Sequence, residues 1–200
     1  MPSEFSPEQL REVVARAREG SEQDFYELYV AFSKPIYNFV WRLIGSVEDA
    51  EDLVQETFLK VHSELKHLRD PNQFRFWLYR IARNEVYQKL RREQRATEVS
   101  IDDEEAGYYN FLKDDLKQPD PEHLALSGEL NEVINRALLS LTPKYRDVFV
   151  LAVFQKMSYE DITKVVGRSL LSVKTDIYRA RLMVKKAITA YMKHSRVGKE

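Results

Sequence analysis

The sequence constrains the fold most strongly through its helix-start signals, because four prolines directly follow a residue that can cap a helix. These pairs are Ser6-Pro7, Asp70-Pro71, Asp120-Pro121 and Thr142-Pro143. Proline suits the first helical position, where its missing N–H costs no hydrogen bond and its fixed φ already matches the helix. Strand-like alternation is scarce, and only 6 Gly and 7 Pro interrupt the 200 residues. The sequence therefore predicts an all-α protein.

Helical periodicity divides the chain into two blocks, and an acidic stretch separates them. The helical period fades over residues 97–119, where the segment IDDEEAGYYNFLKDDLKQPDP is acidic and is interrupted by Gly107 and two prolines. A polar, proline-containing segment without apolar periodicity is typical of a linker. We therefore expect two small helical domains, residues 1–96 and 120–200, joined by an acidic flexible linker over residues 97–119.

Apolar spacing and capping residues set the expected helix boundaries within the two domains. Pro35 lies inside the second apolar block, and we expect it to interrupt or restart that helix because proline removes a backbone donor. The expected helices cover about residues 7–20, 21–45, 46–68 and 71–94 in the first domain, and about 121–140, 143–154, 159–167 and 170–192 in the second.

Charge is segregated along the chain although the formal net charge is only −1. Residues 60–95 hold ten Lys or Arg against four Asp or Glu, and Asp176 is the only acid between Lys164 and Lys199. Segregated basic blocks favour nucleic acid as a partner, with solvated helix faces as the alternative.

Several protein classes are disfavoured by what the sequence lacks. The absence of cysteine rules out disulfides and thiolate metal sites. No apolar run approaches the ~20 residues of a membrane span, and the N-terminus lacks a secretory pattern. The four histidines are scattered without metal-ligand spacing, and neither a Gly-rich phosphate loop nor a nucleophile elbow occurs. We therefore expect a cytoplasmic protein that is not an enzyme, has no cofactor or metal site, and does not insert stably into a membrane.

The expected third helix carries an apolar stripe and, opposite to it, a polar stripe. The apolar stripe consists of Ala50, Val54, Phe58, Val61 and Leu65. The opposite stripe consists of Glu48, Asp52, Gln55, Glu56 and Leu59. Acids, an amide and a leucine on one outward face suit docking onto a basic partner helix. An ordinary solvent-facing surface agrees equally well with these residues.

The expected fourth helix interleaves cations with an amide and aromatic rings. Cations bind phosphates, rings stack on unpaired bases, and an amide reads a base edge. The residues with this chemistry are Arg80, Arg83, Asn84, Tyr87, Lys89, Arg91 and Arg92. Phe74 and Trp77 either pack in the core or form a wedge beside opened bases, and for Asn84 a plain surface position is the alternative.

The C-terminal block predicts a helix-turn-helix. A short helix, a turn containing Gly167 and a longer basic helix match that plan. On the long helix an inward stripe consists of Val173, Ile177, Ala180 and Val184. The outward and flanking positions are Ser172, Lys174, Thr175, Tyr178, Arg179 and Arg181. Such side chains can reach bases and phosphates of a major groove, although similar helical pairs also occur without a DNA-binding role.

Four segments in this order resemble the extracytoplasmic-function group of bacterial sigma-70 factors. They are AEDLVQETFLKV, then FRFWLYRIARN with the following LRR, then LSLTPKYRDVFVLAVFQKMSYEDITKVV, then SVKTDIYRAR, and the resemblance covers roughly residues 20–190. The resemblance implies two helical domains, region 2 and region 4, that bind core RNA polymerase and promoter DNA, both duplex and single-stranded. It also implies an anti-sigma factor as a further partner.

The resemblance assigns roles residue by residue. It places Glu48, Asp52, Gln55 and Glu56 against the polymerase. It places Phe74, Arg75, Trp77, Arg80, Arg83, Asn84, Tyr87 and Arg91 at the −10 element, where Asn84 would help capture an unpaired base. It places Ser172, Lys174, Thr175, Tyr178, Arg179 and Arg181 at the −35 element. The linker would thread toward the active centre of the polymerase.

The sequence departs from the family where the recognition helix begins. The family commonly has a GTVKSR-like run, whereas this chain has LSVKTD, with Leu171 for the glycine and Asp176 for the basic residue. An acid near phosphates is repulsive. Asp176 therefore reads a cytosine amino group, points away from DNA, or marks a weak or atypical −35 contact. Two other functions also stay open: a decoy that sequesters an anti-sigma factor, and a simple helix-turn-helix regulator.

Overall fold

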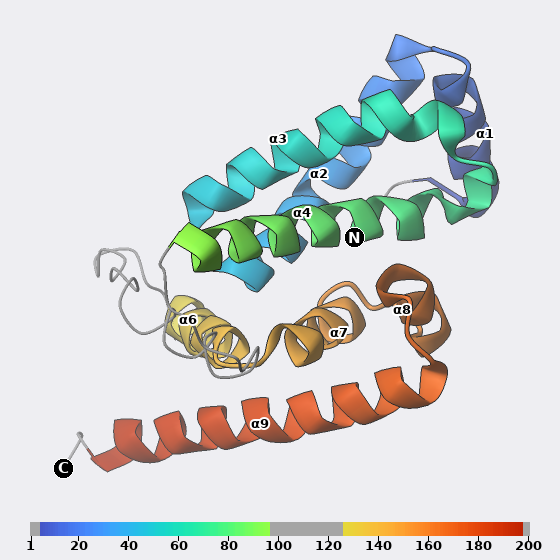
Figure 1. Ribbon diagram of the computed structural model, residues 1–200. Coiled ribbons are helices and arrows are strands. Elements are labelled where there is room, and N and C mark those ends of the chain that lie inside the picture. Colours follow the sequence, from blue (N-terminus) through green and yellow to red (C-terminus); the bar gives the residue numbers. More distant parts are fainter. Residues whose placement is uncertain (1–4, 97–125, 198–200) are drawn as a thin grey trace.

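The computed structural model describes residues 5–96 and 126–197, and every described element is helical (Figure 1). The N-terminal domain contains α1 (Pro7–Arg18), α2 (Glu22–Ile44), α3 (Val47–Glu64) and α4 (Phe74–Ala96). Two short 3₁₀ helices, η1 (Leu65–His67) and η2 (Pro71–Gln73), join α3 to α4. The expected all-α fold is confirmed. The predicted linker over residues 97–119 lies outside the described residues, as does the expected start of the next helix.

The C-terminal domain contains α6 (Leu126–Leu139), α7 (Pro143–Val153), α8 (Tyr159–Val166) and α9 (Leu170–Val197). In Figure 1, α6, α7 and α8 lie between the N-terminal domain and α9. The turn between α8 and α9 contains Gly167, whose φ of 70° is left-handed and ends α8. This left-handed conformation is one that glycine adopts without steric cost.

Serine side chains cap four helices, each of which begins within one residue of its expected start. The hydroxyl oxygens of Ser6, Ser21, Ser46 and Ser158 accept from the backbone N–H three residues on, which satisfies one orphan donor in each first turn. The carboxylate of Asp70 accepts from the backbone N–H of Asn72, two residues on, and it opens η2 rather than α4 directly.

The expected break at Pro35 is wrong, because α2 continues without interruption from Glu22 to Ile44. Proline removes one intrahelical hydrogen bond and would destabilise an isolated helix. Here the same helix buries Leu28, Phe32, Ile36, Phe39 and Val40 completely or nearly so. This burial on both sides of Pro35 outweighs the local cost, and tertiary packing therefore overrides the proline signal.

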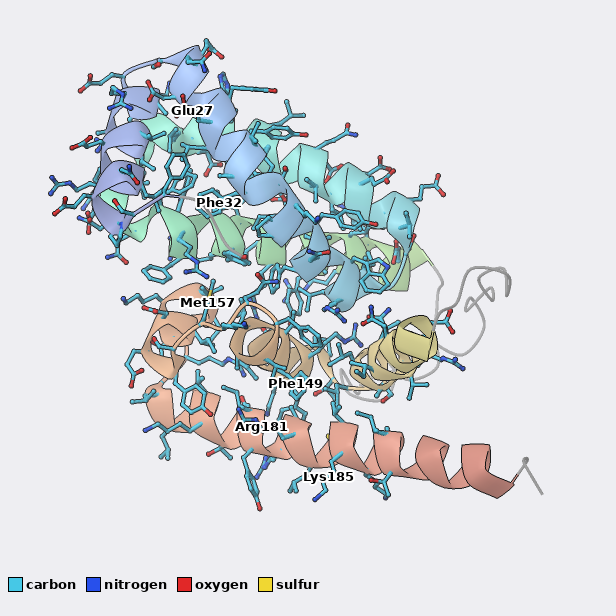
Figure 2. The ribbon with its side chains drawn as sticks, turned by 180° about the vertical axis from the view of Figure 1, so that it is seen from behind. Glu27, Phe32, Phe149, Met157, Arg181 and Lys185 are labelled. Carbon is cyan, nitrogen blue, oxygen red and sulfur yellow. The ribbon has the colours of Figure 1, made fainter. Side chains whose placement is uncertain are left out.

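Aromatic rings form much of the N-terminal core. Phe32 on α2 packs edge-to-face on Phe74 of α4, with ring centroids 5.5 Å apart, and Phe39 packs likewise on Tyr79 at 5.2 Å. Figure 2 shows Phe32 between the helices of this domain. The predicted inward stripe of α3 is confirmed, since Ala50, Val54, Phe58, Val61 and Leu65 are all buried. Within the described ranges no helix is both long and apolar enough to cross a membrane.

The two domains pack directly on each other. Helix α4 contacts α8, and α2 contacts both α6 and α7. Met157, just before α8, is buried and lies on the side of the C-terminal domain that faces α4 (Figure 2). At the end of α2, a Cβ on Gly45 would lie 2.6 Å from the Leu139 side chain of α6, so this side chain packs directly against the glycine backbone.

Candidate nucleic-acid interface

The outward face of α3 lies open to solvent. Its polar residues Glu48, Asp52, Gln55 and Glu56 are all exposed, and Leu59 beside them is 72% exposed. No ion pair joins Glu48, Asp52 or Glu56 to another residue in the described part of the chain. An acidic surface with one projecting leucine, uncompensated by neighbouring cations, is therefore available to a basic partner.

Two lysines fix α3 against α4. Lys89 binds Asp49 at 2.7 Å and Glu93 at 3.1 Å, and Lys60 binds Glu85 at 2.8 Å. The hydrogen bond from Lys60 to Glu85 raises the lysine pKa, and the bond from Lys89 to Asp49 does the same for Lys89. These pairs orient the two helices, so Lys89 has a structural partner although its chemistry alone made it a candidate for phosphate contact.

One face of α4 is uncovered, and it carries the predicted amide between two cations. Arg80, Asn84 and Arg91 are exposed and lie on the same side of the helix, since residues four and seven apart share a face. Trp77 is half-buried and packs against Phe74 with ring centroids 6.2 Å apart. This face can therefore offer phosphate contacts, an amide and the edge of an indole ring to an unpaired strand.

Phe74 lies apart from that face, because its side chain is fully buried between α2 and α4. The ring is enclosed by protein and is unavailable to a base in this structure. Of the two roles that the sequence leaves open for Phe74, the structure favours core packing. Phe74 is therefore not part of the DNA-binding set that we propose below.

The neighbouring face of α4 is covered by the C-terminal domain. Arg83 Nε donates to Asp147 Oδ2 at 2.7 Å, and the Tyr87 hydroxyl donates to the same oxygen at 3.2 Å. The side chain of Asp147 is fully buried, and that of Arg83 is only 20% exposed. Burial is the largest single influence on the pKa of Arg83 and lowers it, but Asp147 and Tyr87 together outweigh burial, so the arginine pKa is raised. Two predicted −10 residues are thus engaged within the protein.

Gln155 holds the other end of α4. Its side-chain oxygen accepts from the Tyr79 hydroxyl at 2.6 Å, and its backbone carbonyl accepts from Arg75 Nη2 at 3.3 Å. Tyr79 is completely buried, and this burial raises the pKa of its phenol. Arg75 is therefore a third predicted −10 residue that contacts the C-terminal domain.

Arg146, next to Asp147 on α7, joins the two domains through backbone carbonyls. It is 2% exposed and donates to the carbonyls of Leu138, Leu139 and Leu141 at the end of α6. It also donates to the carbonyl of Leu43 in the last turn of α2. Helix C-termini leave carbonyls unpaired and carry partial negative charge, so one guanidinium satisfies the ends of two helices from different domains.

Asp176 points into the C-terminal domain. It is only 4% exposed, and its carboxylate binds Arg168 Nη1 at 2.5 Å. Arg168 also binds Asp147 at 3.1 Å, so a chain of charges runs from Arg83 through Asp147 and Arg168 to Asp176. Among the three readings of Asp176, the structure supports the one in which the acid points away from the DNA-facing surface.

The long helix α9 presents its predicted outward residues to solvent. Lys174, Thr175, Tyr178, Arg179 and Arg181 are exposed, whereas Ser172 is half-buried with its hydroxyl 3.5 Å from Asp176. Arg179 reaches across to the Tyr145 hydroxyl at 3.2 Å. The inward stripe of Val173, Ile177, Ala180 and Val184 is buried, which confirms the predicted orientation of this helix.

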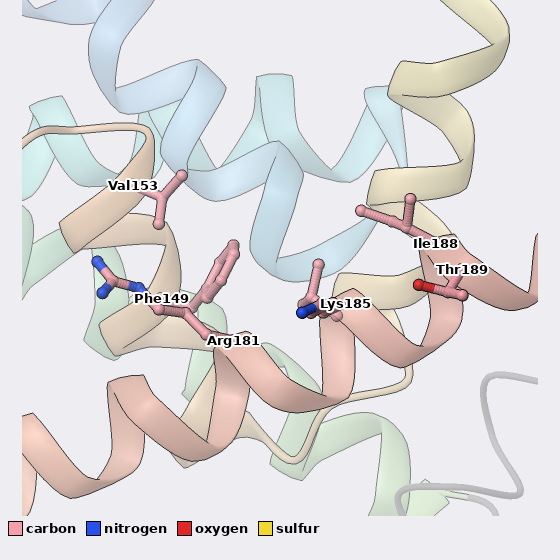
Figure 3. A pocket seen from close by; sticks show the side chains of 7 residues that line it. Phe149, Val153, Arg181, Lys185, Ile188 and Thr189 are labelled. Atoms are coloured by element: carbon pink, nitrogen blue, oxygen red, sulfur yellow. The ribbon is translucent and has the colours of Figure 1, made fainter. Parts of the chain in front are cut away.

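The back of α9 borders an apolar pocket against α7. Phe149, Val153, Val184 and Ile188 line it, and Arg181, Lys185 and Thr189 form its rim, with Phe149 turned toward α9 (Figure 3). Arg181 is the one predicted −35 residue on its lining. The pocket therefore lies beside the outward face of α9 rather than on it.

The sequence analysis missed the residues that join the domains, chiefly Arg146, Asp147, Gln155 and Arg168. A signal was present, because an adjacent arginine and aspartate interrupt the largely apolar run YRDVFVL of an expected helix. The partners of Asp147 on α4 are 60 and 64 residues away in the sequence, and the bond from Arg146 to Leu43 spans 103 residues. Local periodicity contains no information about such distant partners.

Two family models match this chain, one on each domain. The model described as Sigma-70 region 2 matches residues 28–96, and the one described as Sigma-70, region 4 matches residues 131–184. They occur in that order and together span more than half of the 200 residues.

Similar proteins carry matching names. RNA polymerase sigma factor YlaC of Bacillus subtilis is 31% identical over 86% of this chain and 95% of its own length. ECF RNA polymerase sigma-E factor of Escherichia coli is 32% identical over 84% of this chain and 88% of its own. ECF RNA polymerase sigma factor SigW of Bacillus subtilis is 28% identical over 90% of this chain and 96% of its own length.

Two solved structures share the fold. CnrH in complex with the cytosolic domain of CnrY gives a TM-score of 0.67 at 22% identity, over 90% of this chain and 97% of that one. Sigma factor RpoE of Bartonella quintana, in complex with the anti-sigma factor NepR, gives a TM-score of 0.65 at 22% identity. This match covers 84% of this chain and 98% of RpoE. Matches to both regions in order, with relatives above 30% identity along most of their length, show that this chain belongs to the extracytoplasmic-function group of sigma-70 RNA polymerase sigma factors.

Proposed function

We propose that this chain binds core RNA polymerase and directs it to promoters, where it recognises and opens the −10 element and contacts the −35 element. The observation that carries this proposal is the uncovered face of α4, where Asn84 stands between Arg80 and Arg91. This face combines phosphate-binding cations with an amide that can hydrogen-bond to a base edge. The second DNA-binding surface is the outward side of α9, on the other domain.

Polymerase binding is assigned to the outward face of α3. Glu48, Asp52, Gln55 and Glu56 are exposed there, and the acids have no ion-pair partner among the described residues. A basic helix of the polymerase would supply the missing countercharges, and Leu59 would supply apolar contact at one end of this surface.

Opening of the −10 element is assigned to binding energy rather than catalysis. Unstacking a base costs a few kcal/mol, and a protein offsets that cost by stacking and hydrogen-bonding the released base. Trp77 has a partly exposed ring that can stack on a base, and Asn84 can hydrogen-bond to a base edge. Arg80 and Arg91 can bind the backbone phosphates.

Full engagement of the −10 strand requires the two domains to move apart. Arg83 and Tyr87 bind the buried carboxylate of Asp147, and Arg75 binds the backbone of Gln155. These three side chains can contact DNA only after the C-terminal domain leaves α4. We infer that the free chain presents Arg80, Asn84 and Arg91 first, and that polymerase binding exposes the remainder.

An anti-sigma factor is proposed as a further partner, because the sigma factor RpoE of Bartonella quintana, which shares this fold, was solved in complex with the anti-sigma factor NepR. A decoy function has less support. A decoy would have no need for an exposed amide between two arginines, and the burial of Asp176 removes the one feature that spoke against DNA binding by α9. A simple helix-turn-helix regulator would have no use for the open acidic face of α3.

The proposal is tested by replacing Asn84 with alanine. We expect Asn84→Ala to weaken open-complex formation by about 1–3 kcal/mol, the usual value of a good base contact, without changing affinity for core polymerase. Open complexes are measured by permanganate reactivity of unpaired thymines, and polymerase binding by co-elution. Gln88→Ala, which removes another exposed amide one turn away on α4, is the matched control. Equal promoter opening by Asn84→Ala and wild type would remove Asn84 from the mechanism, and failure of the wild-type chain to bind core polymerase would refute the function.

A further inference from the structure

The outward side of α9 has an apolar centre, which is unusual for a surface whose remaining exposed side chains are mostly cationic. Leu171 is 77% exposed, Tyr178 64% and Leu182 52%. With about 100° per residue, these positions and Thr175 fall within one narrow strip directly opposite the buried stripe. We call Leu171, Thr175, Tyr178 and Leu182 the apolar strip.

Cations border this strip on both edges. Lys174, Arg181 and Lys185 follow one edge, and Arg179 and Lys186 follow the other, all of them exposed. The only acid of the α9 residues with described side chains is Asp176, which is buried behind the strip and paired with Arg168. A solvent-facing helix surface with two cationic rows and no exposed acid is complementary to the two phosphate rows that border a DNA groove.

A helix placed in that way turns its centre toward the base edges. The thymine C5-methyl is the apolar group that base pairs present in the major groove, and a leucine side chain has no hydrogen-bonding group with which to read any other feature. Leu171 lies in the first turn of α9, and the N-terminal residues of a recognition helix are the ones that contact base edges. The Thr175 hydroxyl already donates to the Leu171 carbonyl at 2.9 Å, so that proton is not available for a base.

We propose that Leu171 is a specificity-determining residue that packs on the methyl group of a thymine in the −35 element, with Thr175 beside it. This inference rests on the proposed function, because it assigns a base preference to the DNA surface of α9. The alternative occupant of the apolar strip is a partner protein helix. The cationic rows favour DNA, because a protein partner would have to neutralise both rows as well as cover the leucines.

The experiment uses holoenzyme assembled from this full chain and core polymerase, on a promoter identified by run-off transcription of genomic fragments. Each −35 thymine is replaced in turn by deoxyuridine, which removes only the methyl group. We expect one such replacement to weaken wild-type binding by about fourfold, the factor for one buried methyl-sized group. Leu171→Ala should abolish that penalty, as a double-mutant cycle requires of a direct contact.

Folding is not at risk in this variant, because Leu171 is mostly exposed and alanine favours helix. Met183→Ala is the matched control, since Met183 is an exposed apolar residue on α9 outside the apolar strip, and it must keep the wild-type deoxyuridine penalty. The proposal is overturned if no thymine methyl matters, or if the penalty is the same in Leu171→Ala. It is also overturned if Leu171→Ala leaves DNA binding unchanged but weakens assembly with a protein partner. Wild-type holoenzyme that does not form or binds no promoter would instead refute the proposed function.

Discussion

Helices α4 and α9 are both rich in arginine and lysine, yet their cations are used differently. On α4, Arg83 binds the buried Asp147 of the other domain, and Arg75 binds the backbone of Gln155. On α9, the outward cations Lys174, Arg181 and Lys185 are exposed. The cations of α4 are therefore partly bound within the protein, whereas the proposed DNA-binding side of α9 is open to solvent.

The positions of a few acids account for this difference. Asp147 lies on the side of α7 that meets α4, and it binds Arg83 and Arg168 together. Asp176 lies on the inward side of α9 and binds Arg168, which leaves the outward side of that helix without an exposed acid among its described residues. Counting charges along the sequence treats both helices as equally available to DNA. The availability of each cation depends on which acid the fold places next to it.

The largest expected effect comes from removing the link between the two helix ends. Arg146→Met keeps an apolar stem but leaves buried carbonyls of α2 and α6 without their donor. We expect unfolding stability to fall by about 3–5 kcal/mol, measured by urea denaturation. Arg136→Met, which removes an exposed arginine paired with Glu132 at 3.4 Å, should change it by less than about 0.5 kcal/mol. Equal losses in the two variants would show that Arg146 does not join the domains.

Neutralising Asp147, whose carboxylate binds both Arg83 and Arg168, should make the cations of α4 more available, as those of α9 already are. Asp147→Asn leaves Arg83 and Arg168 without their buried countercharge, and we expect a loss of about 3 kcal/mol in stability. The same variant should bind single-stranded −10 DNA more tightly in the absence of polymerase, because Arg83 and Tyr87 are released. Asp161→Asn, which removes a surface pair with Lys164, is the control and should alter neither measurement. Unchanged DNA affinity in Asp147→Asn would mean that the domain contact does not restrict α4.

A pair of glycine substitutions isolates the contact between the domains from backbone strain. Gly45 and Gly167 both end helices with positive φ, at 84° and 70°. Gly167→Ala meets no atom within 4 Å, so we expect only strain of about 1 kcal/mol. Gly45→Ala should cost about 1 kcal/mol more, because its Cβ would lie 2.6 Å from buried Leu139. Thermal denaturation of both variants gives the comparison, and equal losses would indicate that α2 and α6 are not in contact in solution.

The smallest expected effect on stability is at the open face of α4. Arg80→Ala should leave stability within about 0.5 kcal/mol of wild type, because the side chain is exposed. It should nevertheless remove about one phosphate contact from the promoter complex. The measurement is the slope of the logarithm of the binding constant against the logarithm of salt concentration, which should become shallower by about 1. Arg11→Ala, an exposed arginine on α1, should change neither quantity. An unaltered slope for Arg80→Ala would place the −10 strand elsewhere.

Much of the helical fold could be predicted because its signals are local. Ser6, Ser21, Ser46 and Ser158 begin helices where expected, and the inward stripes of α3 and α9 are buried as the helical period requires. Pro35 misled the prediction because its local cost is visible in sequence, whereas the core contacts that offset it are not. Phe74 shows the same limit, since an aromatic residue in a basic helix can face either a base or the core.

The sequence by itself determined that this chain forms capped, amphipathic helices in two blocks, and its ordered motifs identified the sigma-70 family. Helix capping and amphipathic periodicity depend on residues three or four positions apart, so they can be read directly from the sequence. Only the tertiary structure decided that Asp147 binds Arg83 and that Asp176 turns inward to Arg168. These pairings join residues from separate helices, and the packing of whole helices fixes them through burial and charge. That packing also buries Asp176, so the outward side of α9 has no exposed acid among its described residues.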